Sequence, residues 1–513
     1  MELQTLPNTK RPGVFSSQPG GLPVLFFTEL WERFSYYGMR ALLTLFMVAP
    51  VASGGLGFAT ENAGRIYGNY TMAVYMLAIP GGFIADRIIG ARRSVLLGGW
   101  TIALGHYCLA VPQTLFFYLG LLLVALGTGL FKPNISALLG GLYQRDDPRR
   151  DAGFSIFYMG INIGAFIAPL VTGFLAQSPW FKTWLAGNGF DPSKSWHWGF
   201  AAAGVGMTLA MLIFARSSKS LSDPALTMDA APSPRGEREN YAGPQETDGS
   251  VMRHGLFVTL GTLALLGLAL ASDIDGFAGL RWLFVLLPLA AIAYAARQPS
   301  GDAQRLAAVG VLFIASMIFW AVFEQAGTTI ALFADRLTRN EILGVPFPSS
   351  WFQSVNPIFV ILLSPVFAAL WMSFGARQPS PAIKFAVALV FLSSSFLLMV
   401  PAAKLAASGA VSPLWLIGLF FLQTVGELML SPVGLSTMTK LAPERMTGLV
   451  LGVWFLAAAF GNKLAGVLGG GFTSEDPQAL ASAFMMQAIL VAIAAGLLFI
   501  AAPWVKRLSQ DGR

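Results

Sequence analysis

The sequence predicts an all-α integral membrane protein with fourteen transmembrane helices, and three observations support this. Of its 513 residues, 55% are hydrophobic and only 12% are charged, whereas soluble domains contain about 25% charged residues. The mean hydropathy is +0.63. The apolar residues form long continuous segments, which are typical of spanning helices rather than of the short alternating strands of a β-barrel.

The apolar segments are arranged as six, then two, then six along the chain. The first six are expected at about 22–50, 62–89, 92–112, 114–143, 152–177 and 197–216. A polar, proline-containing segment from Ser217 to Arg253 is expected to be a flexible loop. Two shorter segments, about 255–272 and 279–297, flank a predicted hairpin turn at Asp273-Ile274-Asp275. The last six are expected at about 304–334, 351–373, 381–402, 412–439, 446–468 and 479–504.

These segments predict the domain organisation and the orientation of the chain. We expect a cytoplasmic tail (1–21), a six-helix bundle (22–216), a flexible cytoplasmic loop (217–253), a two-helix insertion (254–298), a second six-helix bundle (299–505) and a cytoplasmic tail (506–513). No removable signal peptide is expected, since the first 20 residues are polar. Basic loop residues number roughly 16 on the side of the termini against 7 on the other, which indicates cytoplasmic termini.

A short repeat links the two halves. Pro80…Gly90-Ala91-Arg92 recurs as Pro365…Gly375-Ala376-Arg377, each after the second helix of a six-helix set. Two halves built alike predict a transporter whose substrate lies between them, near the middle of the bilayer.

Composition also excludes several functions. The single cysteine, Cys108, cannot form an intramolecular disulfide, and with only three histidines a protein-built metal site is not expected. We interpret Cys108 and His106 as ordinary interior residues. The net charge of +7 indicates basic cytoplasmic loops rather than nucleic-acid binding. No nucleophile–base set or phosphate loop appears, so we expect no enzyme and no cofactor.

The first helix contains the strongest functional signal. Glu29, Glu32, Arg33 and Arg40 interrupt an apolar segment, and each charge costs about 2.5–3.5 kcal/mol at the centre of a spanning helix. At about 100° per residue these four side chains and Tyr36 share one side of the helix, which must face protein or water. That side could be an internal salt bridge that holds helices together, or a substrate and proton site; we favour the second.

Further polar residues interrupt later helices. Lys132 lies well inside its helix, next to Pro133, and needs a carboxylate partner such as Glu29 or Glu32. Asn162 fits a packing hydrogen bond and a substrate contact equally well. Glu324 and Glu427 are lone carboxylates, which must pair with a cation or take up a proton. Lys463 lies nearer a helix end and is predicted to snorkel to the membrane surface.

The loop between the second and third helices contains Gly82-Phe83-Ile84-Ala85-Asp86-Arg87 and ends in Gly90-Ala91-Arg92-Arg93. It resembles the signature of the major facilitator superfamily. We expect a gating role for Asp86 and Arg87, although simple anchoring of basic residues to headgroups is the alternative for Arg92 and Arg93.

Three motifs together resemble the proton-dependent oligopeptide transporter family: Glu29-x-x-Glu32-Arg33-Phe34-x-Tyr36-Tyr37, Phe157-Tyr158-x-x-Ile161-Asn162-x-Gly164 and Gly426-Glu427-Leu428. The resemblance implies the major facilitator fold of two six-helix bundles, and the two extra helices resemble those of bacterial members. The chain departs from the family at Ala165, where serine is common, and at Gly68, where animal members have histidine. The second departure argues against a histidine-based proton step.

The resemblance implies roles for individual residues. Proton coupling would involve Glu29, Glu32, Arg33, Lys132 and Glu324, and the gate would include Asp86, Arg87 and a pair between Arg40 and Glu324. The peptide carboxylate would lie near Arg33, Arg40 and Lys132 and its amino end near Glu427. The remaining pocket residues would be Tyr36, Tyr37, Tyr75, Asn162, Asn356, Ser431 and Trp454.

The sequence therefore predicts a proton-coupled symporter that imports di- and tripeptides by alternating access. We expect a monomer in the bacterial inner membrane, in contact with lipid, peptides and protons and with no nucleic acid. Two alternatives stay open: a major facilitator transporter of another solute, such as nitrate, a drug or a modified peptide, and a sensor that binds peptide without transporting it.

Overall fold

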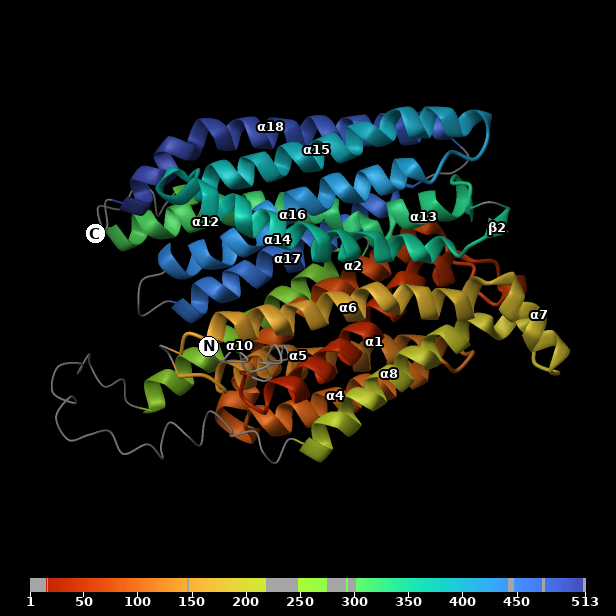
Figure 1. Ribbon diagram of the computed structural model, residues 1–513, viewed down its shortest axis with the longest axis horizontal. Coiled ribbons are helices and arrows are strands. Elements are labelled where there is room, and N and C mark those ends of the chain that lie inside the picture. Colours follow the sequence, from red (N-terminus) through yellow and green to blue (C-terminus); the bar gives the residue numbers. More distant parts are fainter. Residues whose placement is uncertain are drawn as a thin grey trace, which may run out of the picture.

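The computed structural model describes residues 15, 17–144, 147–217, 248–274, 292–293, 301–342, 344–441, 447–472 and 476–510. These residues form two helical bundles that lie side by side along the length of the molecule (Figure 1). The first bundle, red to yellow, lies below the second, which is green to blue. The predicted all-α fold with two bundles is confirmed.

The first bundle contains one helix that is broken where the sequence predicts a continuous one. Its helices are α1 (Leu22–Val48), α2 (Thr60–Met76), α3 (Ala78–Ile84), α4 (Ala91–Leu109), α5 (Thr114–Gly140), α6 (Arg150–Gln177), the short α7 (Pro179–Gly187) and α8 (Ser195–Ser217). The predicted span 62–89 is divided into α2, α3 and a π-helical turn, Ala85–Ile89. Pro80 accounts for the first break, since it has no N–H to donate to the preceding turn.

The second bundle has a similar break. Its helices are α12 (Gly301–Phe323), α13 (Thr329–Arg336), α14 (Val355–Phe374), α15 (Pro381–Leu405), α16 (Leu414–Leu441), α17 (Thr447–Gly470) and α18 (Pro477–Gln510). The predicted span 304–334 is interrupted by a 3₁₀ turn, Glu324–Gly327. A small antiparallel hairpin of β1 (Glu341–Ile342) and β2 (Val345–Pro346) follows α13, and the 3₁₀ turn Ser349–Ser354 leads into α14.

The inserted segment begins earlier than predicted. Helix α10 spans Asp248–Ala271, so the expectation of an irregular loop up to Arg253 is wrong for its last six residues. The rest of that loop, and the predicted helix 279–297 apart from residues 292–293, lie outside the described residues.

Ten helical stretches among the described residues are long and apolar enough to cross a membrane. Helix α1 is not one of them, although it has 27 residues, because charges interrupt it. Those charges do not face lipid: Glu29 and Glu32 are each 1% exposed and Arg33 is 7% exposed. The protein interior therefore supplies the environment that these side chains need.

The repeat of Pro80 and Gly90 with Pro365 and Gly375 coincides with a shared backbone feature. Gly90 follows the π-helical turn with φ +82°, and Gly375 follows α14 with φ +48°. Glycine is favoured at both positions because other residues rarely adopt positive φ. The second helix of each half thus ends in the same way.

The two bundles touch most closely where α2 lies along α17. Gly64 and Gly68 on α2 face Gly466 and Gly470 on α17, with backbone against backbone. Small residues at this spacing let helices approach closely in a membrane. This contact, which we call the glycine seam, leaves no room for a side chain.

We predict that Gly64→Val destabilises the protein by about 1–3 kcal/mol, the usual cost of overpacking. A Cβ atom at Gly64 would lie 2.7 Å from the backbone nitrogen of Gly470, and neither atom can move without moving its helix. Thermal unfolding in detergent should show the loss. Gly496→Val on α18 is the matched control, because nothing lies within 4 Å of a Cβ there. Equal unfolding midpoints for the two variants would contradict a tight seam.

Candidate functional site

The charged residues at the start of α1 form one compact group. The guanidinium Nε of Arg33 lies 2.6 Å from Glu29 Oε1 and 3.0 Å from Glu32 Oε2. One cation thus serves two buried carboxylates, and the second oxygen of Glu29 has no hydrogen-bond partner in the described part of the chain. All three residues belong to α1, so this group cannot hold different helices together. The structure therefore argues against the salt-bridge alternative for these three residues.

Lys132 on α5 does not make the carboxylate pair that the sequence predicts. Its ammonium lies 4.0 Å from the centre of the Tyr75 ring on α2, in a cation–π contact. No ion pair of Lys132 within 4 Å is present among the described residues. Glu29 and Glu32 remain within its electrostatic reach. Lys132 is thus a half-buried cation beside the α1 group, available to bind an anion.

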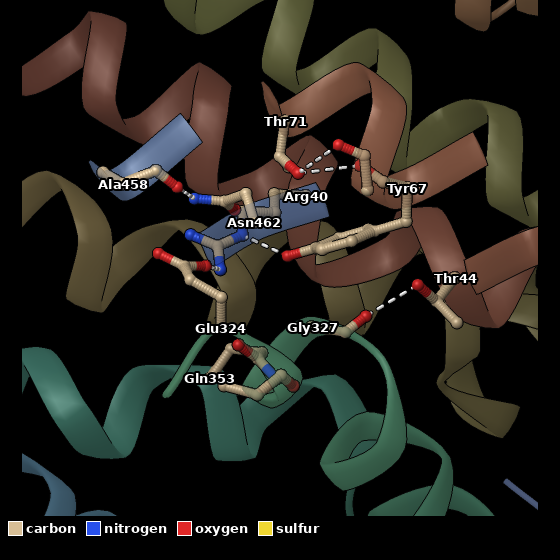
Figure 2. A network of polar contacts seen from close by, with 11 residues as sticks. Arg40, Thr44, Tyr67, Thr71, Glu324, Gly327, Gln353, Ala458 and Asn462 are labelled. Carbon is tan, nitrogen blue, oxygen red and sulfur yellow. Dashed lines mark hydrogen bonds and ion pairs between the residues drawn. The ribbon is translucent and has the colours of Figure 1, made fainter. Parts of the chain in front are cut away.

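Arg40 and Glu324 join the two bundles. Arg40, seven residues after Arg33 on α1, forms an ion pair with Glu324 in the 3₁₀ turn between α12 and α13. Its Nε also donates to the hydroxyl of Tyr67 on α2 at 2.5 Å. Figure 2 shows the guanidinium between these two partners. The predicted pairing across the halves is present in the structure.

Two further contacts explain why the helix breaks at Glu324. The Thr44 hydroxyl on α1 donates to the Gly327 carbonyl at 2.6 Å, and Gln353 donates to the Ala326 carbonyl at 2.5 Å (Figure 2). Both carbonyls lie in the 3₁₀ turn, where helical hydrogen bonding is interrupted. The break thus exposes acceptors that α1 and the turn before α14 use.

The second bundle contributes a carboxylate to the opposite side of the interface. Asn356 at the start of α14 donates to Glu427 Oε2 on α16 at 2.9 Å and to the Thr424 hydroxyl at 3.0 Å. Ser431 follows Glu427 by one helical turn, so the two share a face of α16. Glu427 is therefore oriented by an amide rather than neutralised by a cation.

Tyr37 lies at the centre of these groups. Its hydroxyl is within electrostatic reach of Arg33, Arg40, Glu324 and Glu427, which come from three different helical elements and both bundles. Tyr36 packs edge-on against it, with ring centroids 5.3 Å apart. Cations from the first bundle and Glu427 from the second thus interact with the same tyrosine.

Four predicted residues have other surroundings. The Asn162 amide donates to Tyr158 O of its own helix at 3.0 Å, so its bond joins no second helix. Trp454 is buried inside the second bundle, against Gly434 on α16 and the Phe385 ring. Asp86 and Arg87 are exposed in the π-helical turn after α3, remote from the central group.

Lys463 corrects another sequence interpretation. It does not snorkel to the membrane surface but is 5% exposed and paired with Asp273. The carboxylate that holds it inside the protein lies in the segment expected to be a surface turn.

Sequence reasoning also missed Tyr67 and Tyr158. Tyr67 holds Arg40, and Tyr158 lies within electrostatic reach of Glu427 and Tyr37. Tyr158 belongs to the motif that contains Asn162, which is the signal that could have indicated it.

Among the described residues, the hydrogen bonds between α6 and the second bundle gather at one end of the molecule. At the end that contains α7 and β2 (right in Figure 1), α6 meets the turn before α14 through four hydrogen bonds. The two shortest are Gln177 to the Ser349 hydroxyl, 2.9 Å, and Ser354 to Phe166 O, 2.7 Å. Toward the other end α14 has no buried residue after Val360 among those described. We call the joined end, with Arg40 and Glu324, the closed end.

Comparison with known proteins agrees with this architecture. The family model described as PTR2, POT family, matches residues 92–230 and 284–486. The peptide transporter YePEPT of Yersinia enterocolitica is 38% identical over 522 residues, covering 99% of each protein. A di-/tripeptide transporter of Lactococcus lactis is 37% identical, with 89% of each chain covered. A crystal structure of a mutant of the peptide transporter POT in complex with alafosfalin has 37% identity, a TM-score of 0.80 and 96% coverage of both chains.

We predict that Glu324→Gln weakens the closed end. Removing one partner of a buried ion pair costs about 3–5 kcal/mol, because the other charge stays buried without compensation. Ser350, which is 1% exposed and packs against Gly173 on α6, is a suitable reporter. In a Cys108→Ala background, Ser350→Cys should react faster with a maleimide when Glu324→Gln is present.

The control is Glu341→Gln, which removes a carboxylate from exposed β1 and should leave the labelling rate unchanged. Adding Arg40→Gln to Glu324→Gln should recover part of the protection, since no unpaired charge then remains. Equal labelling of Ser350→Cys in the wild-type and Glu324→Gln backgrounds would show that the pair does not hold this end closed.

Proposed function

The chain belongs to the POT family, and from this premise we propose that it is a proton-coupled symporter that imports di- and tripeptides by alternating access. The observation that carries the proposal is the arrangement around Tyr37. Arg33 and Arg40 of the first bundle and Glu427 of the second interact electrostatically with this tyrosine, and Lys132 lies over the Tyr75 ring.

This arrangement suits a short zwitterion. The peptide carboxylate would bind Arg33 and Lys132, because a guanidinium accommodates a carboxylate with two parallel hydrogen bonds. The amino group would bind Glu427, which Asn356 already orients. The aromatic rings of Tyr36, Tyr37 and Tyr75 would contact side chains without selecting one charge. The Ser431 hydroxyl and the side-chain amide oxygen of Asn162 would complete the polar contacts.

Proton coupling follows from the shared use of Arg33. Glu29 and Glu32 both depend on this one guanidinium, so a substrate carboxylate that binds it leaves one of them without a cation. A buried carboxylate without a partner takes up a proton rather than keep its charge. Peptide binding and proton uptake would then favour each other.

The gating step uses the same chemistry at Glu324. In this closed-end state Glu324 is paired with Arg40, which ties α1 to the second bundle. A proton on Glu324 would remove the ionic part of this contact, and Arg40 would keep Tyr67 as its partner. The two bundles could then separate at the closed end and meet at the other.

The basic loops favour cytoplasmic termini in a bacterial inner membrane, which makes the closed end the outer one. The described state would then release peptide to the cytoplasm. A monomer suffices for this cycle, because a single chain supplies both sides of the site. Asp86 and Arg87, exposed at the other end, would act in the inner gate.

We predict that proteoliposomes accumulate dialanine when the only driving force is an inward proton gradient. Glu32→Gln should abolish this accumulation but preserve exchange of labelled for unlabelled dialanine, which requires no net proton movement. Glu341→Gln on exposed β1 should behave as wild type. Gradient-driven accumulation by Glu32→Gln would exclude the coupling role.

The same assay separates the alternative functions. Saturable binding of dialanine without any flux would indicate a sensor. Uptake of nitrate, a drug or a modified peptide that dialanine does not inhibit would indicate a transporter of another solute.

We predict that Glu427→Gln removes selection for a free amino terminus. A hydrogen bond to a charged group contributes about 1.5–3 kcal/mol, which corresponds to at least a tenfold change in kcat/KM. Wild type should prefer dialanine over its N-acetyl derivative by that factor, and Glu427→Gln should transport the two with similar kcat/KM. An unchanged preference would place the amino group elsewhere.

A further inference from the structure

A second buried ion pair lies away from the central site, and the transport mechanism above does not use it. The Lys463 ammonium on α17 is 2.5 Å from Asp273 Oδ2, and their side chains are 6% and 8% exposed. Asn69 on α2 bonds to both: its Nδ2 donates to Asp273 Oδ2 at 2.7 Å, and its Oδ1 accepts from Lys463 at 2.5 Å. These three residues form what we call the lateral triad.

Each member of the lateral triad comes from a different part of the fold. Asn69 belongs to the first bundle, Lys463 to the second, and Asp273 lies two residues after the end of the inserted helix α10. The inserted helix packs on the first bundle: Gly255 lies against the Phe83 ring on α3, and Arg65 on α2 donates to the Asp273 carbonyl at 3.3 Å. Asp273 is therefore a carboxylate of the inserted segment that bonds to one residue of each bundle, Asn69 of the first and Lys463 of the second.

The lateral triad adjoins the glycine seam. Asn69 directly follows Gly68, and Lys463 lies three residues before Gly466, so the triad extends the backbone contact between α2 and α17. Separation of these two helices would pull Lys463 away from Asn69 and Asp273. A lysine left alone in the bilayer interior costs about 2.5–3.5 kcal/mol, so the triad favours the state in which the helices touch.

We propose that Asp273 and Lys463 form a second latch of the closed end, separate from Arg40 and Glu324, and that the inserted helix α10 serves to position the carboxylate of this latch. The proposal rests on the alternating-access function proposed above. It assigns a conformational role to a segment outside both six-helix bundles. Asp273 and Lys463 are positioning residues here, since neither needs to touch the substrate.

Maleimide labelling of Ser350→Cys in a Cys108→Ala background tests the latch without any transport assay. Asp273→Asn and Lys463→Met should each increase the labelling rate several-fold, because each breaks the pair. The reversed pair, Asp273→Lys with Lys463→Asp, should return the rate to within about twofold of wild type. A merely structural role would leave the reversed pair at least as defective as the single variants.

Lys404→Met removes an exposed lysine at the end of α15 and should leave the labelling rate unchanged. If Lys463→Met does not fold, the isosteric Asp273→Asn still decides the question. Unchanged labelling in Asp273→Asn, while Glu324→Gln increases it, would overturn the latch. Absence of dialanine transport by the wild type would instead overturn the proposed function and leave the labelling result valid.

Discussion

The structure depends on the ion pair of Arg40 and Glu324, which is buried in a part of the molecule that a membrane surrounds. Each of these charges would be costly to expose to lipid, and each therefore constrains where the other can be. The pair joins α1 to the break between α12 and α13 and so fixes which ends of the two bundles meet. The hydrogen bond from Thr44 and the glycine seam form where the same two bundles come together.

The central site can bind a zwitterion because its charged side chains are not all paired with opposite charges. Among the described residues, Arg33 serves two carboxylates, Lys132 contacts an aromatic ring instead of a carboxylate, and Glu427 accepts a hydrogen bond from the Asn356 amide. A site in which every charge were already paired would have little affinity for a zwitterion. Here the unmatched cation and the unmatched carboxylate lie on different bundles, so a ligand that satisfies both also bridges the halves.

Much of the fold could be predicted from sequence, because a spanning helix requires about 20 apolar residues and leaves a clear pattern. The breaks at Leu77 and at Glu324–Gly327 were not predicted, since the residues around them remain apolar. Burial of the charges on α1 followed from their cost in lipid. The partners of these charges could not be predicted from that cost. Arg40 and Glu324 lie 284 residues apart, and only the family resemblance connected them.

The two wrong predictions about buried lysines share one physical cause. Lys132 was expected to need a carboxylate, but the face of Tyr75 stabilises a cation as well. Lys463 was expected to reach the membrane surface, but Asp273 enters from the inserted segment to meet it. Sequence alone shows the cost of a buried charge and not the three-dimensional neighbour that compensates it.

We propose that buried charges exchange partners as the two bundles rock. The most direct test is the distance between spin labels at Ser53→Cys and Ser408→Cys, two exposed positions after α1 and α15, in a Cys108→Ala background. We expect a single distance at neutral pH and a second, longer population when the pH is lowered with dialanine present. One unchanged distance under all these conditions would contradict the proposal.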